Sequence, residues 1–263
     1  MLKEIIISLQ AYYHAHRFIS KHRLWKWIFI PGLIYMLLFC AGIYLFAVSS
    51  HNAIEFMLQR SGVAEWIEKM QASWLSFLLI FAQIILNLIL LLFYFSLFKY
   101  LFLIIGSPLF AYLSEKTESI IEGKEYPFSL KQLLKDILRG VKLALRNMLW
   151  QTVYTVSILI LSFIPVIGWI TPLLALLVEC YYLGFSMIDY SCERNKLSTS
   201  QSIGFIGRHK GLAIGNGMVF YLMHFIPILG WLLAPSYAVI AATISLYKAK
   251  NEGLINVSGK INL

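Results

Sequence analysis

The sequence predicts an all-α integral membrane protein with two long transmembrane helices, two helical hairpins and amphipathic helices on the cytoplasmic side. Of its 263 residues 59% are hydrophobic and 13% are charged, whereas soluble domains average about 45–50% apolar and about 25% charged residues. Long charge-free stretches and a repeated proline-glycine motif are the other two observations. Together they exclude a water-soluble globular fold, and a single membrane domain accounts for residues 1–263.

Two segments are long and apolar enough to cross a bilayer. Residues 27–49 carry no charge, and at 1.5 Å per residue they cover about 34 Å, more than the hydrocarbon core of about 30 Å. Residues 74–105 form the second span, and the polar segment 50–73 between the two is predicted to be periplasmic. One face of the second span carries four polar residues, suited to helix packing or to lining a pathway: Ser76, Gln83, Asn87 and Tyr94.

Residues 107–147 read as amphipathic helices on the cytoplasmic side. Gly106-Ser107-Pro108 predicts the end of one helix and the start of the next, and Ser129 opens a capping box. The helix that follows has an apolar face and an opposite cationic stripe: Lys131, Lys135, Arg139, Lys142 and Arg146. Such a helix suits a bilayer with anionic headgroups, and attraction of anionic solutes is the alternative role.

The back half contains an internal repeat, FIPVIGWITP at 163–172 and FIPILGWLLAP at 225–235. Proline cannot continue a helix and glycine permits a tight reversal, so each copy is expected at the tip of a helical hairpin. The hairpins span 148–188 and 212–247. Their ascending limbs cover only about 26 and 23 Å, less than the hydrocarbon core of about 30 Å. This favours re-entrant hairpins over four tilted, complete spans.

The positive charges set the orientation. Residues 1–26, 107–147, 189–211 and 248–263 hold 19 of the 22 Lys and Arg residues, and short cationic loops stay in the cytoplasm. Both termini are therefore predicted to be cytoplasmic. Because the cations flank apolar blocks, no nucleic-acid partner is expected. The three cysteines have unrelated spacings and predict neither disulfides nor a metal site.

Glu179 lies within the apolar run of the first hairpin, and an ionisable residue at membrane depth is a candidate functional residue. It either couples transport to protons or is a buried carboxyl that bonds Tyr181, Tyr182 or another helix. Asp189, further along, is expected to pair with Arg194 or Lys196. A ridge of small residues suited to close helix packing comprises Gly207, Gly211 and Gly215.

Four segments together resemble a known family: SPLFAYLSEKTESIIEG at 107–123, IDYSCERNK at 188–196 and the two hairpin tips. They are similar to the CysZ-type sulfate permeases, which share a domain family with the eukaryotic etoposide-induced membrane proteins. The resemblance covers residues 17–248. It implies a homo-oligomer of the bacterial inner membrane, with hairpins that penetrate part of the bilayer, moving sulfate inward for cysteine synthesis.

The resemblance also implies where the anion binds. The family places sulfate in the short loop before the first span, at two adjacent arginines. Trp25 and Lys26 occupy those positions here, with Arg23 just upstream. Since helix N-termini favour anions, the hairpin tips are expected to complete the route. The residues expected there are Gly168, Trp169, Gly230 and Trp231.

The leading prediction is therefore a permease or channel for sulfate or a related oxyanion. The alternative is a non-transporting membrane scaffold, or lipid-organising protein, of the same family. No HExxH motif, nucleophile elbow or nucleotide-binding loop is present in the sequence, so an enzyme is not expected, and neither is a cofactor.

Overall fold

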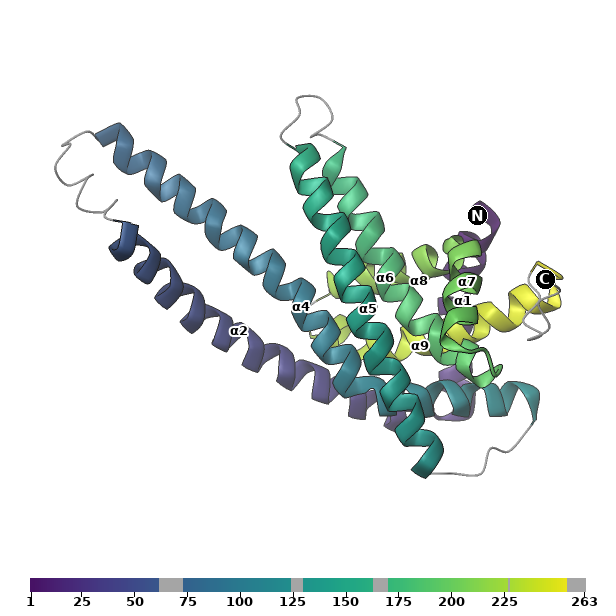
Figure 1. Cartoon of the computed structure of the whole chain (residues 1–263). Helices are drawn as coiled ribbons and strands as arrows, with labels where there is room; N and C mark the ends of the chain where they lie inside the picture. The colour runs from purple at the N-terminus through teal and green to yellow at the C-terminus, as the bar shows by residue number, and fades with distance from the viewer. Residues whose placement is uncertain (62–72, 124–129, 163–169, 227, 255–263) are drawn as a thin grey trace. The chain divides into compact units, whose positions relative to one another are not determined.

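The computed structural model describes residues 1–61, 73–123, 130–162, 170–226 and 228–254 (Figure 1). All the secondary structure in these ranges is helical. Two compact units are distinguished, one made of Met1–Met36 with Leu103–Leu263 and the other of Leu37–Phe102. The helices are α1 (Leu2–His22), α2 (Trp25–Ser61), α4 (Ser73–Glu122), α5 (Leu130–Ser162), α6 (Thr171–Arg194), α7 (Thr199–Arg208), α8 (Lys210–His224) and α9 (Leu229–Asn251).

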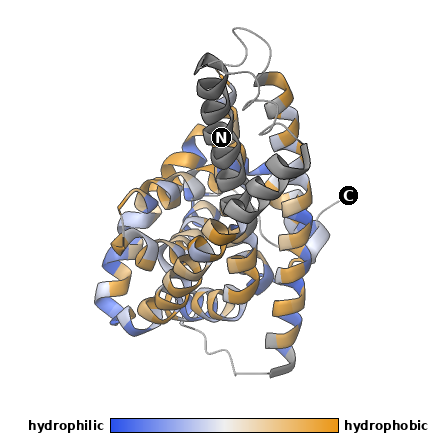
Figure 2. Ribbon diagram, turned by 90° about the vertical axis from the view of Figure 1, so that its left-hand side faces the viewer, coloured by the Kyte–Doolittle hydropathy of each residue, from blue (hydrophilic) through white to orange (hydrophobic). Residues whose placement is uncertain are grey.

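Three described helices have the length and hydropathy of a membrane span. These are residues Trp25–Ser49 of α2, with a mean hydropathy of 2.2, and the helices α6 and α9, with values of 1.5 and 1.6. Hydrophobic positions recur along most of the coloured ribbon (Figure 2). Long apolar helices and the helical secondary structure together confirm the predicted class, an all-α membrane protein.

The unit Leu37–Phe102 contains the later part of α2 and the first part of α4. Phe39 and Phe98 meet edge to face in it, with their ring centroids 5.6 Å apart. α2 extends to Ser61, beyond the predicted end of the first span at residue 49. The polar face predicted on the second span falls on side chains outside the described part of the chain.

The break predicted at Gly106-Ser107-Pro108 is wrong, because α4 continues through these residues to Glu122. Pro108 has no amide hydrogen to donate to the carbonyl of Ile104, four residues back. That carbonyl instead accepts a hydrogen bond of 2.9 Å from the Ser107 hydroxyl. The serine that suggested a helix cap thus satisfies the carbonyl that the proline leaves without its helical partner.

α5 joins the predicted surface helix and the ascending limb of the first hairpin into one helix of 33 residues. Its outer surface carries Leu134 and Leu138, which are 62% and 71% exposed, together with the exposed Lys135. The prediction that Arg139 belongs to the exposed cationic stripe is wrong. Its side chain is only 11% exposed and forms an ion pair with Asp189. The charge of Asp189 draws this one arginine inward.

The second hairpin consists of α8 and α9. α8 has 15 residues, about 22 Å, so it is shorter than the hydrocarbon core of about 30 Å. The reversal uses a positive φ at Ile228, not at Gly230 as the sequence suggested. Gly230 lies inside α9, and a Cβ there would be 1.8 Å from the Met223 carbonyl oxygen. A close approach of the two limbs therefore explains this glycine.

α6 and α8 pack backbone against backbone, with glycines at the contact. A Cβ on Gly184 would lie 1.9 Å from the Ala213 carbonyl oxygen, and one on Gly217 would lie 2.0 Å from that of Cys180. Of the predicted glycine ridge, Gly211 and Gly215 contact α1, whereas a Cβ on Gly207 would meet nothing within 4 Å. Small residues thus bring the two hairpins together.

α1 lies against both limbs of the second hairpin (Figure 1). It runs parallel to α8, because Ser8 donates to the Leu212 carbonyl at 2.9 Å and Tyr12 donates to the Asn216 carbonyl at 2.8 Å. Glu4 accepts a bond from the Gly211 amide at the start of α8. α1, α8 and α9 therefore pack against one another as a group of three helices.

Candidate functional site

The turn between α1 and α2 carries three of the predicted substrate-binding residues, and we call Arg23, Trp25 and Lys26 the cationic turn. Arg23 has φ 54°, and its amide closes α1 on the Ile19 carbonyl. Leu24 is 3% exposed and anchors the turn in the core. Arg23 and Lys26 are exposed, so the buried leucine holds the two cations at the surface.

The electrostatic character of the cationic turn is wholly positive. Lys21 and His22, also exposed, precede Arg23. In the part of the chain that the structure describes, no carboxylate lies within ion-pair distance of Arg23 or Lys26. The N-terminus of α2 adds the positive end of a helix dipole. This arrangement attracts an anion and leaves the cations free to contact it.

Trp25 links the cationic turn to neighbouring aromatic groups. Its ring centroid lies 6.2 Å from that of His16 and 6.2 Å from that of Phe29. His16 in turn shares a hydrogen bond of 2.8 Å with the Tyr237 hydroxyl of α9. The turn is thus connected to the second hairpin through aromatic contacts and a hydrogen bond.

The tip of the second hairpin contains Gly230 and Trp231. The Gly230 amide donates to the Ile226 carbonyl at 2.9 Å, and the Trp231 indole donates to the His224 carbonyl at 3.1 Å. Apolar side chains around them are strongly exposed, for example Phe225 at 82%. These exposures suit a tip that enters lipid. Gly168 and Trp169, predicted at the other tip, lie outside the described residues.

The tip also contacts α2. The Tyr35 hydroxyl and His224 Nε2 are 2.7 Å apart, and a Cβ on Gly32 would lie 2.0 Å from the Leu232 carbonyl oxygen. Gly32 and Tyr35 lie two to three turns after the cationic turn on the same helix. The structure therefore connects the cationic turn to this tip through α2.

Glu179 lies inside the first hairpin and bonds two other helices. Its Oε2 accepts a hydrogen bond of 2.6 Å from the Tyr221 hydroxyl of α8, and its Oε1 accepts one from the Gln151 amide of α5. Of the alternatives expected for a buried carboxyl, Tyr181, Tyr182 or another helix, the structure shows bonds to other helices. Gln151 lies four residues after the buried Asn147 and therefore on the same face of α5. This spacing of two polar residues in an apolar segment was the sequence pattern that could have indicated a polar contact for Glu179.

A buried ion-pair network lies where α5 meets the end of α6, and the sequence did not predict its pairing. Arg139 binds Asp189 through Nε at 3.2 Å and Nη2 at 2.8 Å, and its Nη1 donates to the Leu197 carbonyl at 2.5 Å. The Ser202 hydroxyl also donates to Asp189. Asp189 was expected to pair with Arg194 or Lys196.

Arg194 forms the other half of this ion-pair network. It donates to Glu115 of α4 at 2.9 Å and also to Asp136 of α5. Burial acts to lower the pKa of the Arg139 guanidinium, but Asp189 and the charge of Glu193 raise the pKa above its ordinary value. Arg139 therefore remains charged. Through their ion pairs the two arginines hold α4, α5 and α6 together.

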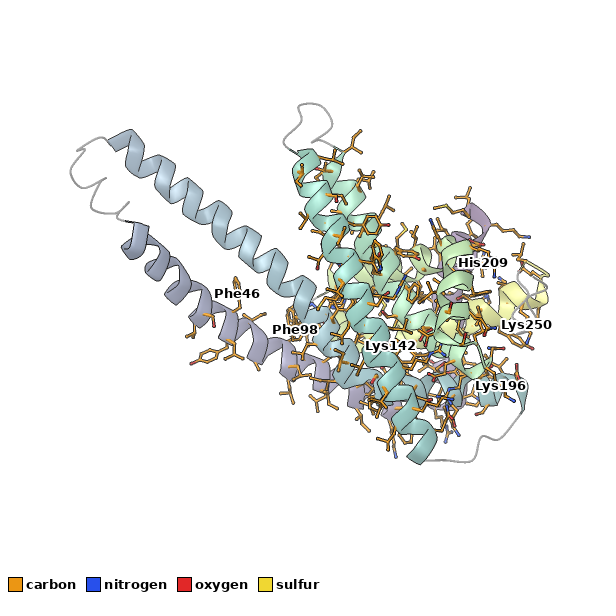
Figure 3. The ribbon with its side chains drawn as sticks, in the orientation of Figure 1. Phe46, Phe98, Lys142, Lys196, His209 and Lys250 are labelled. Atoms are coloured by element: carbon orange, nitrogen blue, oxygen red, sulfur yellow. The ribbon has the colours of Figure 1, made fainter. Side chains whose placement is uncertain are left out.

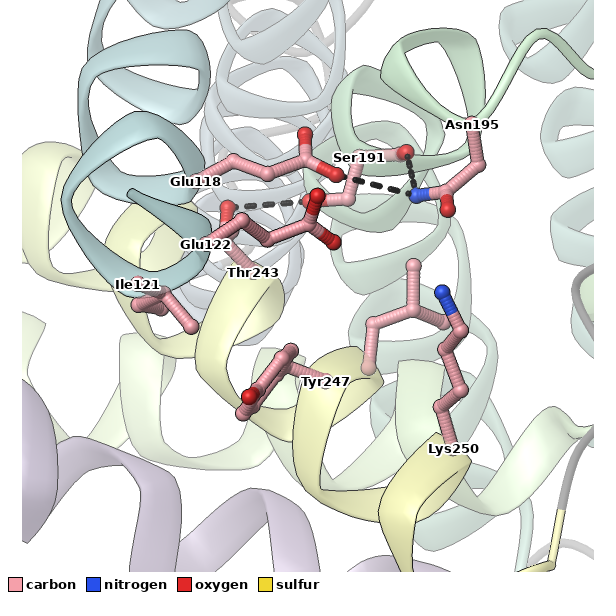
Figure 4. A pocket seen from close by; sticks show the side chains of 9 residues that line it. Glu118, Ile121, Glu122, Ser191, Asn195, Thr243, Tyr247 and Lys250 are labelled. Carbon is pink, nitrogen blue, oxygen red and sulfur yellow. Dashed lines mark hydrogen bonds between the residues drawn. The ribbon is translucent and has the colours of Figure 1, made fainter. Parts of the chain in front are cut away.

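A small polar pocket opens next to the network (Figure 4). Glu118 and Glu122 of α4 face Lys250 of α9 across it. Its floor contains a hydrogen bond of 2.9 Å between the hydroxyls of Ser191 and Thr243. The carboxylates, the ammonium and the hydroxyls share the lining with the apolar side chains of Ile121 and Leu246 and with Tyr247.

The fold and these clusters define a class, a helical integral membrane protein with polar and charged groups held between its helices. Within that class the chain belongs to the family described as Sulfate transporter CysZ/Etoposide-induced protein 2.4, whose model matches residues 11–235. This confirms the resemblance found in the sequence.

The names of similar proteins agree with the family assignment. The chain is 29% identical to the sulfate transporter CysZ of Pseudomonas aeruginosa strain LESB58 over 76% of this chain and 81% of that protein. It is 30% identical to the protein of that name from Pseudomonas syringae pv. tomato, over 82% of each chain. Its identity to the Salmonella typhimurium protein is 28%, over 73% of this chain and 74% of that protein.

Proposed function

We propose that this protein is an inner-membrane permease or channel that moves sulfate or a related oxyanion into the bacterial cytoplasm for sulfur assimilation. Family membership and the names of the relatives support transport of sulfate. The observation in the structure that carries the proposal is the exposed, wholly cationic turn at Arg23 and Lys26. A dianion needs such groups because it must give up its hydration shell.

The proposed route begins at the cationic turn and passes the hairpin tips. Arg23 and Lys26 attract the anion, and Trp25 forms the wall beside them. The tips at Gly168, Trp169, Gly230 and Trp231 then offer helix N-termini towards the membrane interior. Since the Gly230 amide already donates to Ile226, the dipole of α9 is the contribution we assign to the second tip.

We also propose that Glu179 couples sulfate transport to the proton gradient across the membrane. Its two oxygens accept bonds from a phenol and an amide, and both of these partners can also accept a hydrogen bond from a protonated carboxyl. A protonated Glu179 would therefore find an acceptor in α5 or in α8. Exchange of that proton would link inward movement of the anion to the proton gradient.

The proposal also covers the lipid contacts, the orientation and the oligomeric state of the protein. Exposed Leu134 and Leu138 beside Lys135 and Lys142 on α5 suit an interface with anionic lipid headgroups (Figure 3). Both termini are proposed to be cytoplasmic, following the distribution of cations. A homo-oligomer is proposed from the family resemblance, and the mass of the purified protein in detergent, measured by light scattering, tests it.

One uptake experiment separates transport from the scaffold alternative. Purified protein is reconstituted into vesicles, and entry of radiolabelled sulfate is followed with and without excess sulfite, thiosulfate or chloride. Transport predicts uptake above that of protein-free vesicles, with competition by the oxyanions. A scaffold predicts no uptake above that background, and this result would contradict the proposal.

A further inference from the structure

One face of α1 is polar along its whole length. Its members recur at intervals of seven, four, three and four residues, which places them on a single helix face. All of them are exposed. We call this face the α1 stripe, and it comprises Lys3, Gln10, His14, Arg17 and Lys21.

A second exposed face of α1 is apolar and borders the α1 stripe. Ile6, Leu9 and Tyr13 are 45%, 38% and 57% exposed. The remaining face is buried against α8 and α9, with Ala11 and Ala15 fully covered. α1 thus presents a surface suited to lipid next to a surface suited to water, and both remain uncovered by the chain.

Contacts with α9 indicate the depth of the α1 stripe. Between Lys3 and His14 of the stripe, Gln10 accepts a hydrogen bond of 2.8 Å from the Lys248 ammonium. Further along α1, His16 shares a hydrogen bond of 2.8 Å with the Tyr237 hydroxyl. Lys248 and Tyr237 are eleven residues apart, about 16 Å along a helix. α9 is a candidate membrane span, so the upper half of α1 lies beside the apolar part of that span.

Cations at this level cannot face hydrocarbon. Charged side chains inside membranes turn towards protein partners or water. Among the residues that the structure describes, neither Arg17 nor Lys21 has a carboxylate within ion-pair distance. The Arg17 guanidinium instead lies over the Tyr13 ring, 4.5 Å from its centroid. The α1 stripe therefore needs water beside it.

We propose that the α1 stripe is the cationic wall of a water-filled path that connects the cytoplasm to the cationic turn. The inference rests on the proposed function, because the path would carry the same oxyanion. Lys21 lies two residues before Arg23, so the wall and the turn are continuous. A second copy placing its own α1 stripe against this one would oppose like charges, whereas an anion complements them.

Cysteine accessibility in sealed vesicles tests this proposal. Cys40 is exposed, whereas Cys180 and Cys192 are buried, so a Cys40→Ser background receives one new cysteine at a time. His14→Cys and Arg17→Cys probe the α1 stripe, and Leu9→Cys and Tyr13→Cys are the matched controls. The probe is a negatively charged, membrane-impermeant thiosulfonate, whose reaction rate is measured with and without sulfate.

Cysteines in the α1 stripe should react with the probe about tenfold faster than the controls, because a cationic aqueous path concentrates an anionic probe. Sulfate should lower the reaction rate of these cysteines. Equal rates at all four positions, whether fast or slow, would overturn the proposal. Arg17→Glu should reduce sulfate uptake severalfold more than Arg17→Lys, and equal uptake would also count against it. If the unsubstituted protein takes up no sulfate, the proposed function is overturned but the water-filled path is not. The cysteine reaction rates measure the path without requiring sulfate transport.

Discussion

Arg139 holds Asp189 with two hydrogen bonds, 3.2 Å from Nε and 2.8 Å from Nη2, and thereby joins α5 to α6. The side chains are 11% and 7% exposed. The same guanidinium reaches the Leu197 carbonyl beyond the end of α6. One arginine thus fixes both limbs of the first hairpin and the turn that follows it.

Arg139→Gln should strongly destabilise the protein. Removing one partner leaves the Asp189 carboxylate buried without its counter-charge, which costs about 3–5 kcal/mol in the free energy of unfolding. Thermal unfolding in detergent measures the change. Lys142→Gln, at an exposed position of the same helix, is the control and should change the midpoint little. Equal midpoints for the two variants would contradict the role of the ion pair.

Gly184→Ala should disrupt the contact between the hairpins. The added Cβ would lie 1.9 Å from the backbone oxygen of Ala213, and relief of such overpacking costs about 1–3 kcal/mol or more. Gly204→Ala in α7 is the matched control, because its Cβ would meet nothing within 4 Å, and it should stabilise the helix by about 0.5–1 kcal/mol. Thermal midpoints shifted in the same direction would refute the close packing of α6 on α8.

Glu4→Ala should loosen α1 from the second hairpin. The Glu4 carboxylate binds the His209 ring at 2.7 Å and the Gly211 amide at 3.1 Å, where α7 meets α8 (Figure 3). Loss of these bonds should cost about 1–3 kcal/mol and speed hydrogen exchange in α1. Lys3→Ala removes only an exposed pair with Glu252 and is the control. Unchanged exchange in Glu4→Ala would show that the contact does not anchor α1.

Glu179→Gln should separate structure from proton coupling. The amide can keep bonds to Gln151 and Tyr221, because both partners can donate or accept, so the thermal midpoint should stay near that of the unsubstituted protein. If Glu179 carries the proton, sulfate uptake should no longer respond to an imposed pH gradient. A response that persists in Glu179→Gln would assign the residue a structural role only.

The membrane class was accessible from sequence because it depends on local properties. Charge-free length and the proline-glycine repeat predict spans and reversals without knowledge of partners. The pairing of Asp189 with Arg139 was not accessible, because helical periodicity alone placed Arg139 on the exposed face and gave no information on α6. Likewise Pro108 suggested a helix break, since the compensating Ser107 hydroxyl bond depends on a rotamer and not on composition.

The candidate site was partly accessible. Arg23 and Lys26 followed from the resemblance, and the structure places both at the surface. Gln151 and Tyr221 as partners of Glu179 could not be predicted, because three helices must first pack before their side chains meet. Gly230 was expected to permit the reversal, which is wrong, because the positive φ lies at Ile228 and Gly230 instead permits close packing inside α9.

Sulfate uptake by an Arg23→Gln, Lys26→Gln double variant tests whether the cationic turn binds the transported anion. The matched control removes two exposed lysines elsewhere on the chain, Lys116→Gln and Lys196→Gln, so both proteins lose the same charge. The double variant at the cationic turn should take up sulfate about tenfold more slowly, because local charge concentrates the anion. The control should stay near the rate of the unsubstituted protein. Equal uptake by both variants would contradict this role of the cationic turn.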